Sequence, residues 1–114
     1  MTEERYLGKI TTVDFGFGGY QDAMIGVSFT LESDKDHWGC GDFKGWWGTD
    51  IKVDKHTKWS EEDRNKSYSD VVRFINKLLV EAKKRHLHEL KGVPVEVIFE
   101  DMKLKSWRIL TEVI

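Results

Sequence analysis

The chain has 114 residues, a net charge of −2, 39% hydrophobic and 33% charged residues, which fits one globular domain spanning residues 1–114. The negative net charge argues against strong non-specific binding to nucleic acid, because such binding needs a basic face that displaces counterions from phosphates. The single cysteine, Cys40, permits no internal disulfide, and no apolar run approaches the ~18 residues that span a bilayer.

The first half of the chain predicts strands and glycine turns. Residues 5–15 are rich in β-branched and aromatic side chains and predict a strand. The sequence GFGG at 16–19 predicts a turn or bulge, because glycine adopts positive φ at no steric cost. Residues 22–31 alternate and predict a second strand, paired with the first as a hairpin. The predicted core face of this strand is Ile25, Val27, Phe29 and Leu31.

The connection to the second half is less regular. Residues 32–37 predict an exposed turn, and residues 38–48 return as a glycine-broken strand or loop. Residues 50–53 predict a further short strand or an ordered loop.

A helix is predicted from Ser60, which is a good N-cap, and Asp63 can close a weak capping box. Apolar residues then recur at spacings of three and four and predict one buried face. They are Tyr68, Val71, Ile75, Leu78, Leu79 and Ala82. We expect a break near 67–69, a continuation through Leu87 and Leu90, and a left-handed cap at Gly92.

The C-terminal part predicts a second hairpin, with strands at 94–99 and 107–114 and a turn between them. The predicted fold is α+β: a single two-layer domain whose antiparallel sheet, in the order β-β-(β)-α-β-β, packs one main amphipathic helix on one face.

Residues with catalytic or metal-binding chemistry are few and scattered. His37, Cys40 and Asp42 form H-x-x-C-x-D, but a closed zinc site needs a fourth ligand and usually more cysteines. His37 could activate Cys40, yet nothing orients a third group. His86 and His88 are two apart and should point to different faces of a helix. We therefore predict no metal site.

Acid–base and phosphate chemistry have equally weak signals. The carboxylates Asp14, Asp22, Asp42 and Glu96 could meet in space, but their spacing does not show it. The GFGGY stretch lacks the G-K-[ST] of a P-loop and precedes a predicted strand, where a dinucleotide fingerprint precedes a helix. We predict no catalytic residue, no cofactor and no enzymatic activity.

Two segments rich in glycine and aromatic residues, 16–20 and 38–48, are the candidate site. Glycines next to aromatic residues have two physical uses. An aromatic ring can cover the bare backbone of a strand glycine, or the glycine can admit a ligand that lies against aromatic faces. The sequence leaves both uses open. The predicted binding residues are Phe17, Gly18, Gly19, Tyr20, Trp38, Asp42, Phe43, Trp46 and Trp47.

Several stretches together resemble a family of short proteins encoded by bacteriophages and prophages. They are GKITTVDFGFGGYQDAMIGVSF, GDFKGWWG, KWSEEDR, KGVPVEVIFED and LKSWRILTEV. The resemblance covers nearly the whole chain and implies a phage origin and a single domain, but it brings no activity and no catalytic residue. Cys40 is not part of the family pattern, which further weakens a thiol or zinc mechanism.

We therefore expect a small phage-encoded accessory protein that binds a partner in a glycine- and aromatic-lined groove without catalysis. The expected partner is a small molecule, nucleotide-like because bases stack on Trp and Tyr, or a host protein, with counter-defence as a purpose. The alternative is a homo-oligomeric interaction module, such as a homodimer, with the aromatics at its interface. The single cysteine and the polar start, MTEERYLGK, predict the host cytoplasm and no membrane partner.

Overall fold

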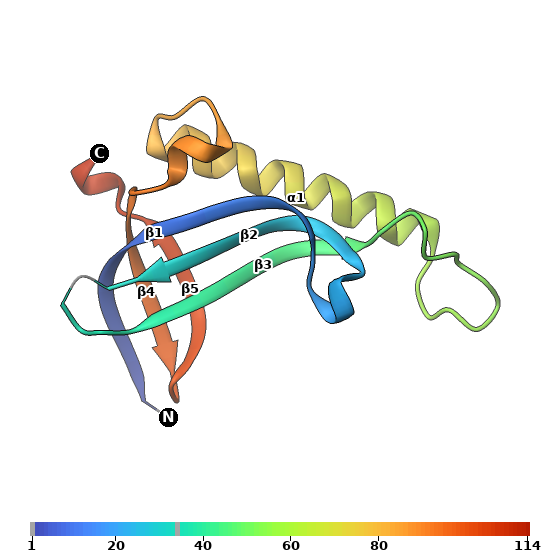
Figure 1. The fold of residues 1–114 in the computed structure, drawn as a ribbon, viewed down its shortest axis with the longest axis horizontal. Helices are drawn as coiled ribbons and strands as arrows, with labels where there is room; N and C mark the ends of the chain where they lie inside the picture. Colours follow the sequence, from blue (N-terminus) through green and yellow to red (C-terminus); the bar gives the residue numbers. More distant parts are fainter. Residues whose placement is uncertain (1, 34) are drawn as a thin grey trace.

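The computed structural model describes residues 2–33 and 35–114 and shows a five-stranded antiparallel sheet with one long helix on one face (Figure 1). The strands are β1 (Glu3–Gly18), β2 (Met24–Glu32), β3 (Gly39–Trp47), β4 (Pro94–Glu100) and β5 (Lys103–Ile109), and the helix is α1 (Glu61–Ala82). Short 3₁₀ turns are η1 (Tyr20–Asp22), η2 (Leu87–Leu90) and η3 (Thr111–Val113). The predicted α+β fold class is confirmed.

The sheet has the strand order β3-β2-β1-β4-β5, with β1 shared between its two halves. Residues 3–9 of β1 pair with β4, and residues 9–18 pair with β2. The pairing with β2 skips Thr11, which is a β-bulge. A bulge bends its strand and increases the local twist. As a result, β4 and β5 run steeply across the direction of β2 and β3 (Figure 1).

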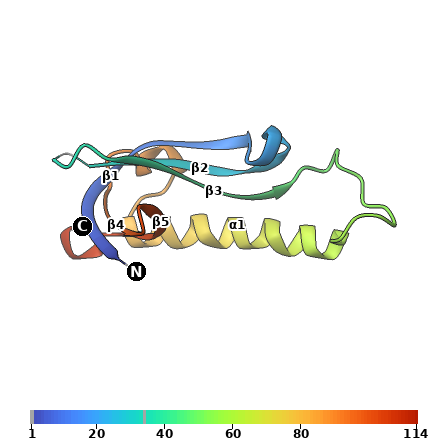
Figure 2. The ribbon, with the colours of Figure 1, turned by 90° about the horizontal axis from the view of Figure 1, so that it is seen from below.

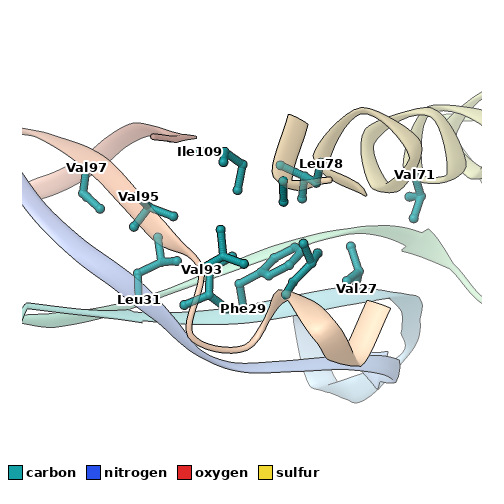
Figure 3. Packing of buried hydrophobic residues seen from close by; sticks show 12 residues of the cluster. Val27, Phe29, Leu31, Val71, Leu78, Val93, Val95, Val97 and Ile109 are labelled. Atoms are coloured by element: carbon teal, nitrogen blue, oxygen red, sulfur yellow. The ribbon is translucent and has the colours of Figure 1, made fainter. Parts of the chain in front are cut away.

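The core fills the space between the curled sheet and α1, which lies along the β1–β3 layer (Figure 2). The predicted inward set of β2 is confirmed for Val27, Phe29 and Leu31, whereas Ile25 is only half-buried. Side chains from β2, β4, β5 and α1 meet there (Figure 3). The buried apolar residues are Ile10, Val27, Phe29, Leu31, Val71, Leu78, Ala82, Leu90, Val93, Val95, Val97 and Ile109.

The two outermost strands of the sheet, β3 and β5, are linked through side chains. Trp107 on β5 donates its indole Nε1–H to Asp42 Oδ2 on β3 at 2.7 Å. Phe74 on α1 packs edge-on against the rings of Phe29 and Trp107. These contacts close the curl of the sheet around the helix.

Helix α1 begins as the sequence predicts and ends earlier. The capping box is present: Asp63 N donates to Ser60 Oγ, and Ser60 N donates to Asp63 Oδ2. The helix runs unbroken through 67–69 and ends at Lys83, which adopts the left-handed conformation with φ 56°. Gly92 is not its cap. The polar run 83–86 supplies no residue to continue the apolar face, so Leu87 and Leu90 pack from the separate turn η2.

Other element boundaries also differ from expectation. Strand β1 continues to Gly18, through most of the predicted turn at 16–19, and the reversal falls at 19–23, where Gly19, Gln21 and Asp22 have positive φ. The segment 38–48 is a regular strand for most of its length, and 50–53 form no strand. The last hairpin turns at Asp101 and Met102. Its second strand, β5, therefore begins at Lys103 and not at the predicted residue 107, and Thr111–Val113 form η3.

The loop between β3 and α1 is held by a buried arginine. Arg64 donates from Nη1 to Gly48 O at 2.7 Å and from Nη2 to Ile51 O at 2.5 Å. Its Nε lies 3.0 Å from Glu61 Oε1, an ion pair without hydrogen-bond alignment, and its guanidinium carbon lies 4.7 Å from the ring centre of Trp59. Hydrogen bonds from the Arg64 guanidinium to two carbonyls therefore hold the start of this loop, where none of the described strands pairs with it.

We predict that Arg64→Met lowers the free energy of unfolding by about 3 kcal/mol, because two loop carbonyls lose a charged donor. Urea unfolding followed by circular dichroism measures this. Glu61→Gln is the control: it keeps both carbonyl bonds and removes only an exposed partner, so it should cost less than about 1 kcal/mol. Equal losses in the two variants would contradict this assignment.

Candidate functional site

The predicted binding residues do not share one surface. Side chains alternate along β3, and directly paired residues lie on the same face of the sheet. Asp42 pairs with Phe29 and Trp46 with Ile25, so both face α1. Phe43 and Trp47 therefore lie on the opposite, outer face. The predicted groove divides between the two faces of the sheet.

On the outer face, glycines from three strands lie in one row. Gly16 pairs with Gly26, and Gly26 pairs with Gly45. A Cβ added at Gly26 would lie 2.2 Å from Lys44 O, and one at Gly45 would lie 2.3 Å from Ile25 O, whereas one at Gly16 would meet nothing within 4 Å. Gly26 and Gly45 are thus required by the close approach of β2 and β3, not by a ligand.

Phe43 covers the neighbouring glycines. A Cβ added at Gly18, Gly19 or Gly45 would come within 3.0 Å of its ring. Nearby, Tyr20 packs edge-on against Trp47, with ring centroids 6.1 Å apart. Here the glycines and aromatics have the structural use, in which a ring shields bare backbone.

The members on the helix side also have structural partners. Trp46 packs edge-on against Trp59 with ring centroids 6.1 Å apart, and Asp42 accepts the bond from Trp107. Phe17 lies near Gly48, since a Cβ there would be 3.3 Å from its ring, yet it is 68% exposed. None of these residues lines either of the two hollows described next.

Trp38 lies elsewhere, in the wall of a hollow of about 820 Å³. The hollow lies where the start of β1, the β2–β3 loop and the β4–β5 turn come together. Figure 1 shows the start of β1 and the β4–β5 turn side by side at one end of the sheet, and Asp101 N donates to Thr2 O at 3.0 Å. The lining residues are Thr2, Glu4, Tyr6, Asp36, Trp38, Phe99, Asp101 and Met102.

Three aromatic rings in mutual contact form the apolar wall of this hollow. The centroids of Tyr6 and Trp38 are 6.0 Å apart, those of Tyr6 and Phe99 5.8 Å, and those of Trp38 and Phe99 5.3 Å. Strand pairing positions two of them, because Glu4 opposes Phe99 and Tyr6 opposes Val97. Gly8 makes room for the third: a Cβ there would lie 2.9 Å from Trp38 Cη2. The wall is therefore fixed by register and packing.

The polar part of the hollow is acidic. Its lining includes the carboxylates of Glu4, Asp36 and Asp101 and no lysine or arginine. The Tyr6 hydroxyl donates to Glu4 Oε2, and this bond, burial, and the charges of Glu4 and Asp36 raise the pKa of Tyr6. Asp101 Oδ1 accepts a bond from Thr2 N at 3.2 Å. An adjoining hollow of about 430 Å³ shares Tyr6 and Asp36 and carries Arg5 and Lys35.

Groups considered for catalysis or metal binding lie apart. Burial and then the charge of Asp42 raise the pKa of the Cys40 thiol, so it stays protonated at neutral pH, and it is no activated nucleophile. Across residues 2–33 and 35–114, His, Cys, Asp and Glu form no group of three that could hold a metal ion. His86 and His88 do not point apart as expected; their rings stack 5.8 Å apart around η2.

The four carboxylates considered for acid–base chemistry do not form a pair. Asp42 faces α1, and Asp14 lies on the outer face opposite Ser28. Glu96 is paired with Arg108 at 3.1 Å, and Asp22 is exposed in η1.

No protein-family model matches the chain, and no curated protein or solved structure is similar to it. Within the described part of the chain, no helix is both long enough and apolar enough to cross a membrane.

Sequence reasoning missed most of the hollow. Tyr6 and Phe99 are separated by almost the whole chain and meet only through the pairing of β1 with β4. The available signal was the alternation of Glu4, Tyr6 and Gly8, which places a carboxylate, an aromatic ring and a glycine on one face of the first strand.

We predict that Gly26→Ala lowers the free energy of unfolding by about 2 kcal/mol, because its methyl group meets the backbone of β3. Gly16→Ala in the same row is the matched control and should change stability by less than about 0.5 kcal/mol. Thermal or urea unfolding compares the two. Similar losses would show that the outer face is sensitive everywhere, and not only where the strands approach.

Proposed function

We propose that the protein is a non-catalytic binding protein and that the hollow around Tyr6, Trp38 and Phe99 holds its ligand. The observation that carries this proposal is a cavity of about 820 Å³ with an aromatic wall and carboxylates in its lining. Pockets for small molecules typically have about 300–1,000 Å³, mostly apolar walls and a few polar groups. This supports the expected binding function at a different place from the predicted groove.

The groups in the hollow favour binding over chemistry. The raised pKa of Tyr6 keeps its phenol protonated at neutral pH, which makes it a poor base or nucleophile. The Glu4 carboxylate accepts the hydrogen bond of that phenol. Together these groups present a fixed, polarised surface, as expected of a recognition site.

A protein–protein interaction is the second candidate. Phe15, Phe17 and Tyr20 are 51%, 68% and 65% exposed near the β1–β2 end, and exposed aromatics are common interface anchors. Pairing through the β3 edge is disfavoured, because Asp42 and Lys44 on this strand point inward, an arrangement that protects edges from pairing. The phage origin, the counter-defence role and the cytoplasmic location stay predictions.

We predict that small molecules that bind the protein shift the indole N–H resonance of Trp38 more than that of Trp46. The measurement is a ¹⁵N-resolved NMR screen of neutral, cationic and anionic fragments, with Trp38→Phe used to assign the peak. Trp38→Ala should weaken the hits at least about tenfold, as loss of a central aromatic anchor does.

Tyr20→Ala is the control for this screen, because it removes an exposed ring outside the hollow and should leave fragment affinity unchanged. A screen without hits, or with hits that move only Trp46 and Trp47, would refute the proposed site.

The second candidate is tested separately by sedimentation. If the β1–β2 end is a self-association surface, the protein sediments as a dimer and Phe17→Ser converts it to a monomer. A monomer at all concentrations would remove the homo-oligomer alternative.

A further inference from the structure

We propose that the ligand of the hollow is a small organic cation, such as a molecule with a quaternary ammonium group. This inference rests on the proposed function and specifies the class of ligand. Three features support it. They are the angles between the aromatic rings, the negative charge of the lining, and the pairing of nearby lysine and arginine side chains with other carboxylates.

The aromatic wall fits a rounded group better than a flat one. The planes of Tyr6, Trp38 and Phe99 are inclined to one another by 51°, 61° and 79°. Rings inclined in this way cannot hold a flat base between two parallel faces of the wall. A compact cation is attracted by the electron-rich faces of Trp, Tyr and Phe when it lies within about 6 Å of a ring centre, and Trp binds most strongly.

The charge of the lining has the sign that a cation needs. Glu4, Asp36 and Asp101 contribute three carboxylates, and within the described residues none of them forms an ion pair with Lys or Arg. The hydrogen bonds from the Tyr6 hydroxyl and from Thr2 N occupy only part of the acceptor capacity of Glu4 and Asp101.

Neighbouring acidic residues differ, because basic side chains already neutralise them. Lys105 pairs with Glu3 at 2.9 Å and with Glu100 at 3.2 Å. Arg108 pairs with Glu96 at 3.1 Å. These pairs do not include the carboxylates of the hollow, although Arg5 and Lys35 line the adjoining hollow that shares Asp36. A nucleotide, which carries phosphates, would meet repulsion there, so the expected nucleotide-like ligand is not favoured by this site.

Titration behaviour agrees with this charge distribution. Besides the hydrogen bond to Glu4 and burial, the negative charges of Glu4 and Asp36 raise the pKa of Tyr6, because they disfavour a negative charge on its phenol. The field that disfavours a phenolate at this position attracts a cation.

The test is calorimetric titration of the full chain with choline and with its uncharged isostere 3,3-dimethylbutan-1-ol, followed in parallel by the indole resonance of Trp38. We expect choline to bind at least about tenfold more tightly than 3,3-dimethylbutan-1-ol. We expect adenosine monophosphate to leave the Trp38 resonance unchanged. Equal affinity for the two isosteres, or preference for the nucleotide, overturns the cation inference while the hollow remains the binding site.

If neither isostere nor any fragment binds, the proposed function itself fails, and this outcome is distinct from the previous one. Choline that binds without moving the Trp38 resonance would also overturn the inference, because the cation would then lie elsewhere.

Asp36→Asn tests the contribution of charge without changing shape. It lies on an exposed part of the lining, so the fold should tolerate it, and we expect choline affinity to fall about fivefold, as for removal of a unit charge a few ångströms away in a hydrated site. Affinity for the uncharged isostere should not change.

Asp14→Asn is the matched control, because it removes the same charge from the exposed outer face of the sheet. It should leave choline binding unchanged at moderate salt, where distant charges are screened. Equal effects of the two variants would show a dependence on net charge alone and would refute a specific cation site.

Discussion

The bend of β1 is the constraint on which the rest of the structure depends. One strand pairs with β4 over its first half and with β2 over its second half, and the bulge at Thr11 lies at the junction. Without that bend the sheet would curl less, and β5 would lie farther from β3. With it, Trp107 reaches Asp42, and Phe74 can pack between the two ends of the sheet. The same bend brings Tyr6 and Phe99 to the β2–β3 loop, so the core and the hollow have one geometric cause.

The face of the sheet on which each aromatic residue lies follows from the alternation of side chains along the strands. Consecutive tryptophans on β3 must point to opposite faces: Trp46 joins the helix side, and Trp47 joins the outer face with Tyr20. Glycines on the outer face let β2 and β3 approach closely, and Phe43 covers the backbone that they leave bare. This surface is stabilised by its own side chains, whereas the rings around Tyr6 leave a cavity beside them. Aromatic content alone therefore does not locate a binding site; the space next to the rings does.

Local features of the fold were predictable from the sequence, and long-range ones were not. The capping box at Ser60, the α+β class and three of the four predicted core residues of β2 depend on neighbouring residues, and these are confirmed. The helix end at Lys83 and the turn at Asp101 and Met102 depend on left-handed residues that are not glycine, for which the sequence carries only a weak signal. The hollow depends on the register of β1 against β4 and on the bulge, and neither can be read from periodicity.

The hollow lies outside the part of the sheet that α1 and η2 cover. Side chains of α1 meet β2, β3 and β5 through Phe74 and its neighbours, and η2 covers the middle of β1 near Ile10. Within the part of the chain that the structure describes, the start of β1 and the β4–β5 turn lie beyond this cover. Large rings at Tyr6, Trp38 and Phe99 protect the end of the core from water, but they lean on one another at steep angles and do not fill the remaining space. A charged, partly apolar molecule in that space would contact both kinds of wall, the aromatic rings and the carboxylates.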